Sequence, residues 1–344
     1  MNTRAHGDLQ GELPIGLVGA TGYAGQVLHA LLMQHPRMRP VVFTGHEPTQ
    51  AWVDLARDCA AVALAVPDEA ALAWTAALAP TGTRVLDLST AHRLAPGIHY
   101  GLPELFGAPP ANATLVANPG CYPTAALLVL APLVRAGLCT SPVAVYGASG
   151  TSGAGKALRE DLHFSELFGN SFPYKVGTHK HIPEIAGKLG LEISFVTQML
   201  PVVRGLAITA WVRCDHPPAV LQQTLARFYD GAPWVTVLPE PGEGLGLRHA
   251  VGTHQAILAV GPVAHGGMIP VFATIDNLMR GAASQALHNL NLWLGLPAGA
   301  GLPASAPPVG AFAPAPHGVG SRAWASAPQT ASTTVPSHPK EPPT

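Results

Sequence analysis

The chain of 344 residues has little charge of either sign. Only 11% of its residues are charged and the formal net charge is −1, so no basic field exists to attract nucleic acid. We therefore expect a small molecule, or a second copy of the chain, as the partner. A hydrophobic content of 48% over this length is enough for two domains with separate cores.

Cysteine and long apolar runs are also scarce. The four cysteines, at positions 59, 121, 139 and 214, show neither CxxC spacing nor a Cys/His ligand pattern, which argues against a disulfide scaffold and a metal site. The first residues, MNTRAHGDLQGELP, contain no apolar signal core, and no later stretch has about 18 uninterrupted apolar residues. We expect a cytoplasmic protein with no membrane contact.

A strand, a glycine loop and a helix are predicted near the N-terminus. The stretch LPIGLVGATGYAGQVLHALLMQHP has an apolar run, then glycines with GxxGxxG spacing, then apolar residues at helical spacing that end before Pro36. Glycines let a backbone approach a pyrophosphate, and a helix N-terminus favours its charge. An ordinary glycine turn before a helix is the alternative. The candidate cofactor-binding residues of this loop are Gly19, Ala20, Thr21, Gly22, Tyr23, Ala24 and Gly25.

The end of the second predicted strand bears on the choice of cofactor. It carries Thr44, Gly45 and His46, with neither the acid that usually holds the ribose of NAD nor an arginine. This pattern favours NADP over NAD, with Thr44 as a contact.

Further strands alternate with helices at first and then become less regular. The runs PVVFTG, AAVALAVP and TRVLDLS, with the helical DEAALAWTAALA between the last two, indicate a parallel sheet. The later runs PVAVYG, LEISFV and LAITAWV indicate an α+β domain with a mixed or antiparallel sheet. Residues 276–295 read as one long helix with Met279, Ala283, Ala286, Leu290 and Leu294 on one face. Residues 298–344 are rich in proline without periodicity, so we expect a disordered tail.

One cysteine lies in an unusual turn. ANPGCYPTAALLVLAPL puts Cys121 after Asn-Pro-Gly and before an apolar run that predicts a buried helix, with Pro123 in its first turn and Gly137 after its end. Unpaired N–H groups at a helix N-terminus would stabilise a thiolate there. The alternative is a small buried hydrophobe.

Three polar stretches complete the candidate site. GTHKHIPEI carries His179 and His181 in a predicted loop, where an imidazole could exchange protons with a thiol, although either could be one more surface histidine. GASGTSGAGK could hold an anion with the hydroxyls of Ser149 and Ser152 and with Lys156, or could be a flexible connector. Arg204 lies between apolar runs and should meet an acid of the protein or of the substrate.

Taken together, these pieces resemble the N-acetyl-gamma-glutamyl-phosphate reductases of arginine biosynthesis. The resemblance rests on GATGYAG, LDLSTAHR, YGLPEL, VANPGCYPTA, SGTSGAGK, HKHIPEI, RGLAIT and DNLMRGAASQALHNLNLWLG, in family order over nearly all of residues 15–297. It implies an α/β protein with a Rossmann dinucleotide-binding domain (12–120 and 276–297), an α+β catalytic and oligomerisation domain of the semialdehyde dehydrogenase type (121–275), and the tail. A homo-oligomer, dimer or tetramer, is expected.

The same resemblance assigns roles to individual residues. Cys121 is the implied nucleophile, His181 and His179 are the implied acid/base and substrate-contacting pair, and Ser89 joins the cofactor-binding set. The implied substrate-binding residues are Arg93, Asn118, Ser149, Ser152, Lys156, Glu184 and Arg204. The Ser-Arg pair that usually holds the 2′-phosphate of NADP in this family is missing.

The implied reaction is reduction of an acyl phosphate through a cysteine thioester. Cys121 would displace phosphate from N-acetyl-gamma-glutamyl phosphate, and NADPH would reduce the thioester to the semialdehyde. Three alternatives remain: a reductase of carrier-bound aminoadipyl phosphate from the lysine pathway, a cysteine acyl hydrolase or transferase on the same fold, and a nucleotide-sensing regulator without turnover.

Overall fold

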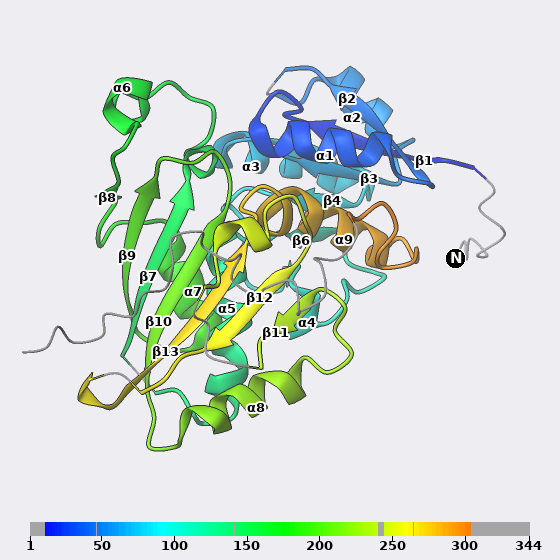
Figure 1. Cartoon of the computed structure of the whole chain (residues 1–344). Coiled ribbons are helices and arrows are strands. Elements are labelled where there is room, and N and C mark those ends of the chain that lie inside the picture. The colour runs from blue at the N-terminus through cyan, green and yellow to red at the C-terminus, as the bar shows by residue number, and fades with distance from the viewer. Residues whose placement is uncertain (1–10, 46, 141, 240–243, 264, 304–344) are drawn as a thin grey trace, which may run out of the picture.

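Two β-sheets with their covering helices make up the protein (Figure 1). The computed structural model describes residues 11–45, 47–140, 142–239, 244–263 and 265–303. His46, at the end of the second predicted strand, lies outside these residues.

The first sheet has six strands in the order β2-β1-β3-β4-β6-β5, all parallel. Its strands are β1 (Leu13–Val18), β2 (Met38–Phe43), β3 (Ala61–Leu64), β4 (Val85–Asp87), β5 (His99–Tyr100) and β6 (Leu115–Ala117). Its helices are α1 (Tyr23–Met33), α2 (Gln50–Ala56), α3 (Asp68–Leu78) and α4 (Pro103–Phe106). The predicted parallel sheet is confirmed, and the loop after β1 lies where the strand order reverses, which is the usual place for a ligand crevice.

The second sheet has seven strands in the order β11-β12-β13-β10-β7-β9-β8. They are β7 (Val143–Gly150), β8 (Phe172–Tyr174), β9 (Ile193–Leu200), β10 (Leu206–Arg213), β11 (Val235–Val237), β12 (Ala256–Val260) and β13 (Met268–Ile275). Two pairs of strands, β7 with β9 and β11 with β12, are parallel and the others are antiparallel. The prediction of a mixed sheet is thereby confirmed.

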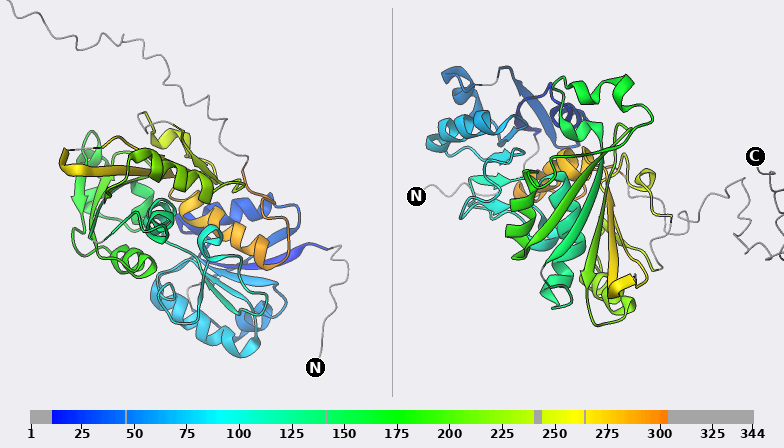
Figure 2. Two further views of the ribbon diagram at one scale, coloured as in Figure 1. Left: turned by 90° about the horizontal axis from the view of Figure 1, so that it is seen from below. Right: turned by 90° about the vertical axis from the view of Figure 1, so that its left-hand side faces the viewer.

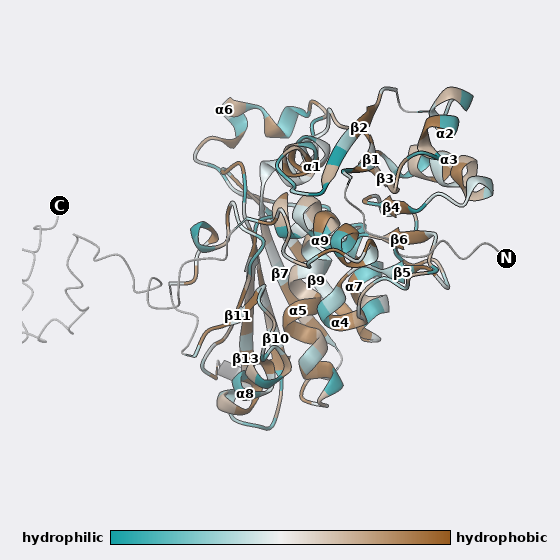
Figure 3. Ribbon diagram, turned by 90° about the vertical axis from the view of Figure 1, so that its right-hand side faces the viewer, coloured by the Kyte–Doolittle hydropathy of each residue, from teal (hydrophilic) through white to brown (hydrophobic). Residues whose placement is uncertain are grey.

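Helices cover one face of the second sheet. They are α5 (Cys121–Arg135), α7 (His181–Leu189) and α8 (Pro218–Phe228), with α6 (Phe164–Leu167) on a separate excursion. In Figure 3 the sheet is seen nearly edge-on, with α5 and α7 on the same side of it. Short 3-10 turns lie at Ala79–Thr81, Thr151–Ala154, Glu160–Leu162, Leu247–His249 and His265–Gly267.

Helix α5 is the centre of the larger core. All side chains from Tyr122 to Leu133 are buried, and they pack against apolar residues of β10, β12 and β13. The helix ends as predicted, with Gly137 at a φ of 71° directly after the last turn, a conformation that glycine adopts without steric cost. This packing holds the N-terminus of α5, and therefore Cys121, in one place.

The C-terminal segment returns to the first domain, but not as one continuous helix. A π-turn (Met279–Ala283) precedes α9 (Ser284–Trp293). Both pack against α1, and Figure 2 shows this orange segment beside the blue α1. Met279, Ala283 and Leu290 enter the core of the first domain. The prediction of a single helix was therefore wrong at its start, where the backbone widens around Gly281.

The predicted start of the disordered tail at residue 298 was also wrong. The Asn291 side-chain amide donates to the carbonyls of Ala298 (3.1 Å) and Ala300 (2.8 Å), and Leu302 packs against the core of the first domain. Residues 298–303 are therefore part of the folded body, because buried Asn291 supplies partners that no local pattern reveals. Residues 304–344 lie outside those that the structure describes.

Candidate active site

Cys121 is the first residue of α5, as predicted. Strand β6 ends at Ala117, the Asn-Pro-Gly turn follows, and Gly120 caps the helix without a side-chain hydrogen bond. Gly120 leaves space for its neighbours: a Cβ there would lie 2.5 Å from His181 Nε2 and 2.6 Å from Arg93 Nη1. The turn therefore lets a histidine and an arginine approach the backbone beside the thiol.

The thiol is not activated in the way that the helix position predicts. Burial raises the pKa of Cys121 to about 11, although backbone N–H groups of the first turn and the Arg93 guanidinium act in the opposite direction. Glu184 adds to the increase. The loss of hydration thus outweighs the helix N-terminus, and the resting side chain is a neutral thiol at neutral pH.

The two histidines lie together, and one of them is on a helix. His179 lies outside any helix, strand or turn, whereas His181 is the first residue of α7, so the predicted loop was wrong from residue 181 onwards. Their ring centroids are 4.8 Å apart, and the backbone N–H of His181 donates to Nδ1 of the His179 ring (3.2 Å). His181 Nε2 faces Arg93 Nη1 at 3.4 Å, while its buried Nδ1 has no hydrogen-bond partner in the described part of the chain.

Both imidazoles are neutral at neutral pH. Burial, followed by the charges of Lys175 and Lys180, lowers the pKa of His179 to about 4. Burial and the Arg93 guanidinium hold the pKa of His181 well below its ordinary value. A neutral imidazole can accept a proton from a thiol and return it later.

Arg93 and Glu184 form a buried ion pair across the two domains. Arg93 Nη1 donates to Glu184 Oε2 (3.0 Å), and its other N–H groups donate to the carbonyls of Leu88 and Asn118. Glu184 Oε1 accepts from the Tyr100 hydroxyl (2.6 Å) and the Gly120 N–H (3.0 Å). These internal contacts favour a positioning role for both side chains rather than the predicted substrate contact.

Two other predicted residues also have internal partners. The Asn118 amide donates to the Ala282 carbonyl (3.2 Å) and accepts from Asn289 (3.0 Å). Ser89, predicted to bind the cofactor, donates from its hydroxyl to Asp87 Oδ2 (2.9 Å) just beyond β4. Thr44 lies exposed directly after β2.

Aromatic side chains pack beside the histidines, and the sequence analysis did not predict them. The Tyr122 hydroxyl donates to the Gly147 carbonyl (3.3 Å) and lies 3.1 Å from the Tyr174 hydroxyl. The His179 ring packs edge-on against Tyr122, Tyr174 and Phe195. The position of Tyr122 next to Cys121 is a signal in the sequence, whereas Tyr174 comes from β8 and has none.

The glycine loop has the close packing that a dinucleotide cradle requires. A Cβ on Gly25 would lie 2.1 Å from the Gly19 carbonyl oxygen, and one on Gly19 would lie 2.3 Å from the Ala65 carbonyl oxygen. Gly22 precedes α1 without a side-chain cap, which leaves N–H groups of the first turn for an anion. Ala20, Thr21, Tyr23 and Ala24 complete this turn, and the residues present fit a dinucleotide.

A cavity of about 570 Å³ brings the cofactor loop and the predicted anion loop together. Tyr23 lines it from the first domain, and Ser152, Lys156 and Arg204 line it from the second. Lys156 Nζ also donates to the Thr21 carbonyl (3.3 Å).

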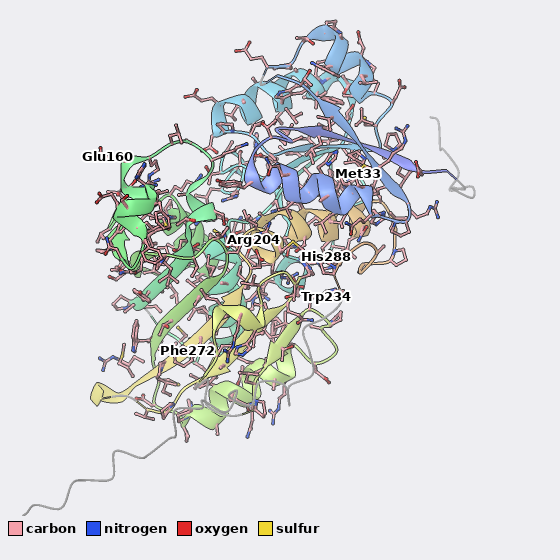
Figure 4. The ribbon with its side chains drawn as sticks, turned by 45° about the horizontal axis from the view of Figure 1, so that its top comes forward. Met33, Glu160, Arg204, Trp234, Phe272 and His288 are labelled. Carbon is pink, nitrogen blue, oxygen red and sulfur yellow. The ribbon has the colours of Figure 1, made fainter. Side chains whose placement is uncertain are left out.

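Polar contacts fix the walls of this cavity. Arg204 meets the expected acid, with Nη1 3.8 Å from Asp276 Oδ2, and Figure 4 shows it between the second sheet and α1. Ser152 lines the cavity and donates its hydroxyl to the Val203 carbonyl, whereas Ser149 is not among the lining residues and donates its hydroxyl to the Gly150 carbonyl.

Neither a metal centre nor a membrane segment is found in the described residues. No group of three or more His, Cys, Asp or Glu side chains there could hold a metal ion. No helix in the same ranges has the length and apolar character needed to cross a bilayer.

Two family models match the chain. The semialdehyde dehydrogenase NAD binding domain matches residues 49–113, and the semialdehyde dehydrogenase dimerisation domain matches residues 121–277.

Curated proteins match along most of their length. The N-acetyl-gamma-glutamyl-phosphate reductase of Salinispora arenicola is 39% identical over 330 residues, and that of Sulfurimonas denitrificans is 34% identical over 331 residues. The alignments cover 84% and 85% of this chain and 97% of each relative.

Solved structures share the fold at low sequence identity. Aspartate semialdehyde dehydrogenase II from Vibrio cholerae, complexed with ASA, has a TM-score of 0.67 at 17% identity, covering 83% of this chain and 98% of its own. Aspartate semialdehyde dehydrogenase with NADP from Candida albicans has a TM-score of 0.59 at 15% identity, covering 82% and 98%.

Proposed function

The chain belongs to the family of N-acetyl-gamma-glutamyl-phosphate reductases, and we propose that it performs the reaction for which that family is named. This is the NADPH-dependent reduction of N-acetyl-gamma-glutamyl phosphate to N-acetylglutamate semialdehyde in arginine biosynthesis. The observation that carries the proposal is Cys121 at the N-terminus of α5, beside a pair of buried neutral histidines.

Cys121 is the proposed nucleophile. Its sulfur attacks the acyl carbon, its proton passes to a neutral imidazole of the His179/His181 pair, and the bond from carbon to the phosphate oxygen breaks. Because the resting thiol is protonated, this proton transfer accompanies the attack. The backbone N–H groups of Cys121 and Tyr122, which already act on the sulfur, are the proposed donors to the developing negative charge.

NADPH, when bound, supplies the hydride that reduces the enzyme thioester. The imidazole that holds the proton then returns it to the sulfur as the thiohemiacetal collapses to the aldehyde. Lys156 and Arg204, which line one cavity with Ser152, are the proposed partners of the anionic groups of the substrate.

The residues proposed to hold NADPH are those of the 19–25 loop, with Thr44 near the 2′-phosphate. An exposed Thr44 offers a hydroxyl without negative charge, which tolerates a phosphate. We expect a lower KM for NADPH than for NADH, and Thr44→Asp should reverse that order by repelling the phosphate. Equal KM values in the unmodified enzyme would contradict the NADP assignment.

A second copy of the chain is the proposed partner. The dimerisation-domain match covers the second sheet, and the face away from α5 carries half-exposed side chains such as Thr209, Trp211 and Phe272. We propose that this face packs against its counterpart in a dimer.

All four cysteines are free thiols, which supports a cytoplasmic reaction.

An assay in the direction of aldehyde oxidation tests the proposal. Phosphate-dependent reduction of NADP should proceed with N-acetylglutamate semialdehyde and be at least about tenfold slower with the homologue that is one carbon longer. Cys121→Ser should lower kcat at least about a thousandfold while NADPH binding persists, and Cys59→Ser is the matched control. Faster turnover of the longer homologue would favour the lysine-pathway reaction instead.

A further inference from the structure

The π-turn that precedes α9 lies directly against the candidate nucleophile. A Cβ on Gly281 would lie 2.6 Å from Cys121 Cβ and 3.0 Å from its Cα, so the two backbones are in contact with no room for a side chain between them. The Gly281 N–H donates to the Asp276 carbonyl (2.9 Å), and the Ala282 carbonyl accepts from Asn118. The turn thus contacts both the thiol-bearing residue and the bend before it.

A fully buried arginine holds this turn. Arg280 Nη2 donates to Glu104 Oε1 of α4 (2.5 Å), and Nη1 lies 2.5 Å from His254 Nε2, just before β12. His254 in turn contacts Ser284 Oγ (2.7 Å) and His288 Nδ1 (3.3 Å) of α9. Figure 4 shows His288 close to Trp234, whose ring packs against His254.

The charges in this cluster balance around one ion pair. Burial, followed by the Arg280 guanidinium, holds the pKa of His254 well below its ordinary value and lowers that of His288 to about 4. Glu104 is then the acid that compensates Arg280 in the interior, and the pair must stay together because an isolated buried charge is costly. The π-turn is therefore tied to α4 on one side and to the second domain on the other.

We propose that Arg280 is a positioning residue for Cys121, which it serves by pressing the Gly281 turn against the N-terminus of α5. Arg280 has no solvent-exposed surface, so it acts through the turn and not on the substrate. Without its ion pair the turn relaxes away from Cys121, and the thiol loses its fixed direction of attack. The inference rests on the proposed role of Cys121 as nucleophile.

The test uses Arg280→Met combined with Glu104→Gln, so that no buried charge is left alone. Two quantities are measured on the folded enzyme: kcat and KM, and the rate of Cys121 alkylation by iodoacetamide without substrate. We expect kcat to fall roughly tenfold to a hundredfold with KM within about twofold, and the alkylation rate to change at least about fivefold. Arg280→Lys, which keeps a charge for Glu104, should recover part of kcat.

Arg135→Met is the matched control at the opposite end of α5. Arg135 donates to the Leu105 carbonyl and lies over the rings of Phe106 and Phe228, so its loss should lower the melting temperature without altering alkylation. If the Arg280 double variant behaves in the same way, with only stability changed, the inference is overturned. A fall in kcat with unchanged alkylation overturns it as well.

Gly281→Ala provides a second test of the proposal if the double variant does not fold. Its new Cβ should displace Cys121 and change the alkylation rate, whereas Gly187→Ala in α7, which meets only Leu94 Cδ2 at 3.2 Å, should not. Unchanged alkylation in Gly281→Ala contradicts the contact. Alkylation needs no turnover, so the two proposals can fail separately. If only the proposed reaction is wrong, the wild-type enzyme is inactive with the proposed substrate, while the variants still change the alkylation rate of Cys121 as expected.

Discussion

Two opposing effects act on the pKa of Cys121, and its position in the sequence does not show which of them is larger. The start of a helix supplies N–H groups that favour a thiolate, and burial removes the water that a thiolate needs. Burial dominates, since the pKa rises to about 11. Pairing with a neutral imidazole, rather than prior ionisation, is therefore the proposed route to a nucleophilic sulfur.

Buried histidines also determine how stability depends on pH. The pKa values of His179 and His288 are about 4 in the folded chain and about 6.5 when unfolded. As pH falls from about 6.5 to 4, only the unfolded state takes up these protons. The free energy of unfolding should fall by about 1.4 kcal/mol per pH unit for each histidine in this window.

Urea denaturation at pH 7, 6 and 5 measures this slope. His288→Asn should reduce the slope by the contribution of one histidine, about 1.4 kcal/mol per pH unit. His216→Asn, at an exposed position, should leave the slope unchanged. Equal slopes in the two variants would show that His288 does not contribute to the pH dependence of stability.

At the scale of elements, the turn between β1 and α1 depends on Gly25. Gly25→Ala places a Cβ 2.1 Å from the Gly19 carbonyl oxygen, so the turn must open and the cradle for the pyrophosphate is distorted. We expect the Kd for NADPH to rise at least about tenfold and the melting temperature to fall. Calorimetric titration and thermal melts measure both.

Gly22→Ala is the control for that change. Its Cβ would have no atom closer than 3.6 Å, and its φ of −73° suits any residue. The fold should therefore tolerate it, and a melting temperature as low as that of Gly25→Ala would show that the close contact is not the cause.

At the scale of the whole molecule, the C-terminal boundary can be tested by truncation. Ending the chain after Pro303 should leave the melting temperature nearly unchanged. Ending it after Pro297 removes both carbonyl acceptors of Asn291, whose own Oδ1 lies 3.0 Å from His35 Nε2. That shorter chain should lose about 1–3 kcal/mol of stability, and equal melting temperatures for the two truncations would contradict this account.

The proposed dimer gives a second prediction at this scale. Trp211→Lys places a charge on the face of the second sheet away from α5, where Trp211 is half-exposed, so it should shift the mass measured by light scattering from dimer towards monomer. Tyr23→Lys, on the cofactor loop, is a surface control. An unchanged mass for Trp211→Lys would mean that the copies meet elsewhere.

The amino-acid sequence by itself determined what depends on neighbouring residues. The glycine loop, the helix that begins at Cys121 and the alternation of strands and helices are local patterns, and each is present in the fold. The acid expected near Arg204 was also predictable, because an arginine between apolar runs needs a partner. The resemblance to a family with a known order of motifs extended these local inferences to the expectation of two domains.

Only the tertiary structure decided what depends on residues far apart in the chain. Arg93 meets Glu184 across 91 positions, and Arg280 meets Glu104 across 176. The pKa of Cys121, the π-turn at Gly281 and the folded residues 298–303 all follow from such contacts. Hydration and ion pairing are set by the groups that surround a side chain in space, and a one-dimensional pattern does not record which groups those are.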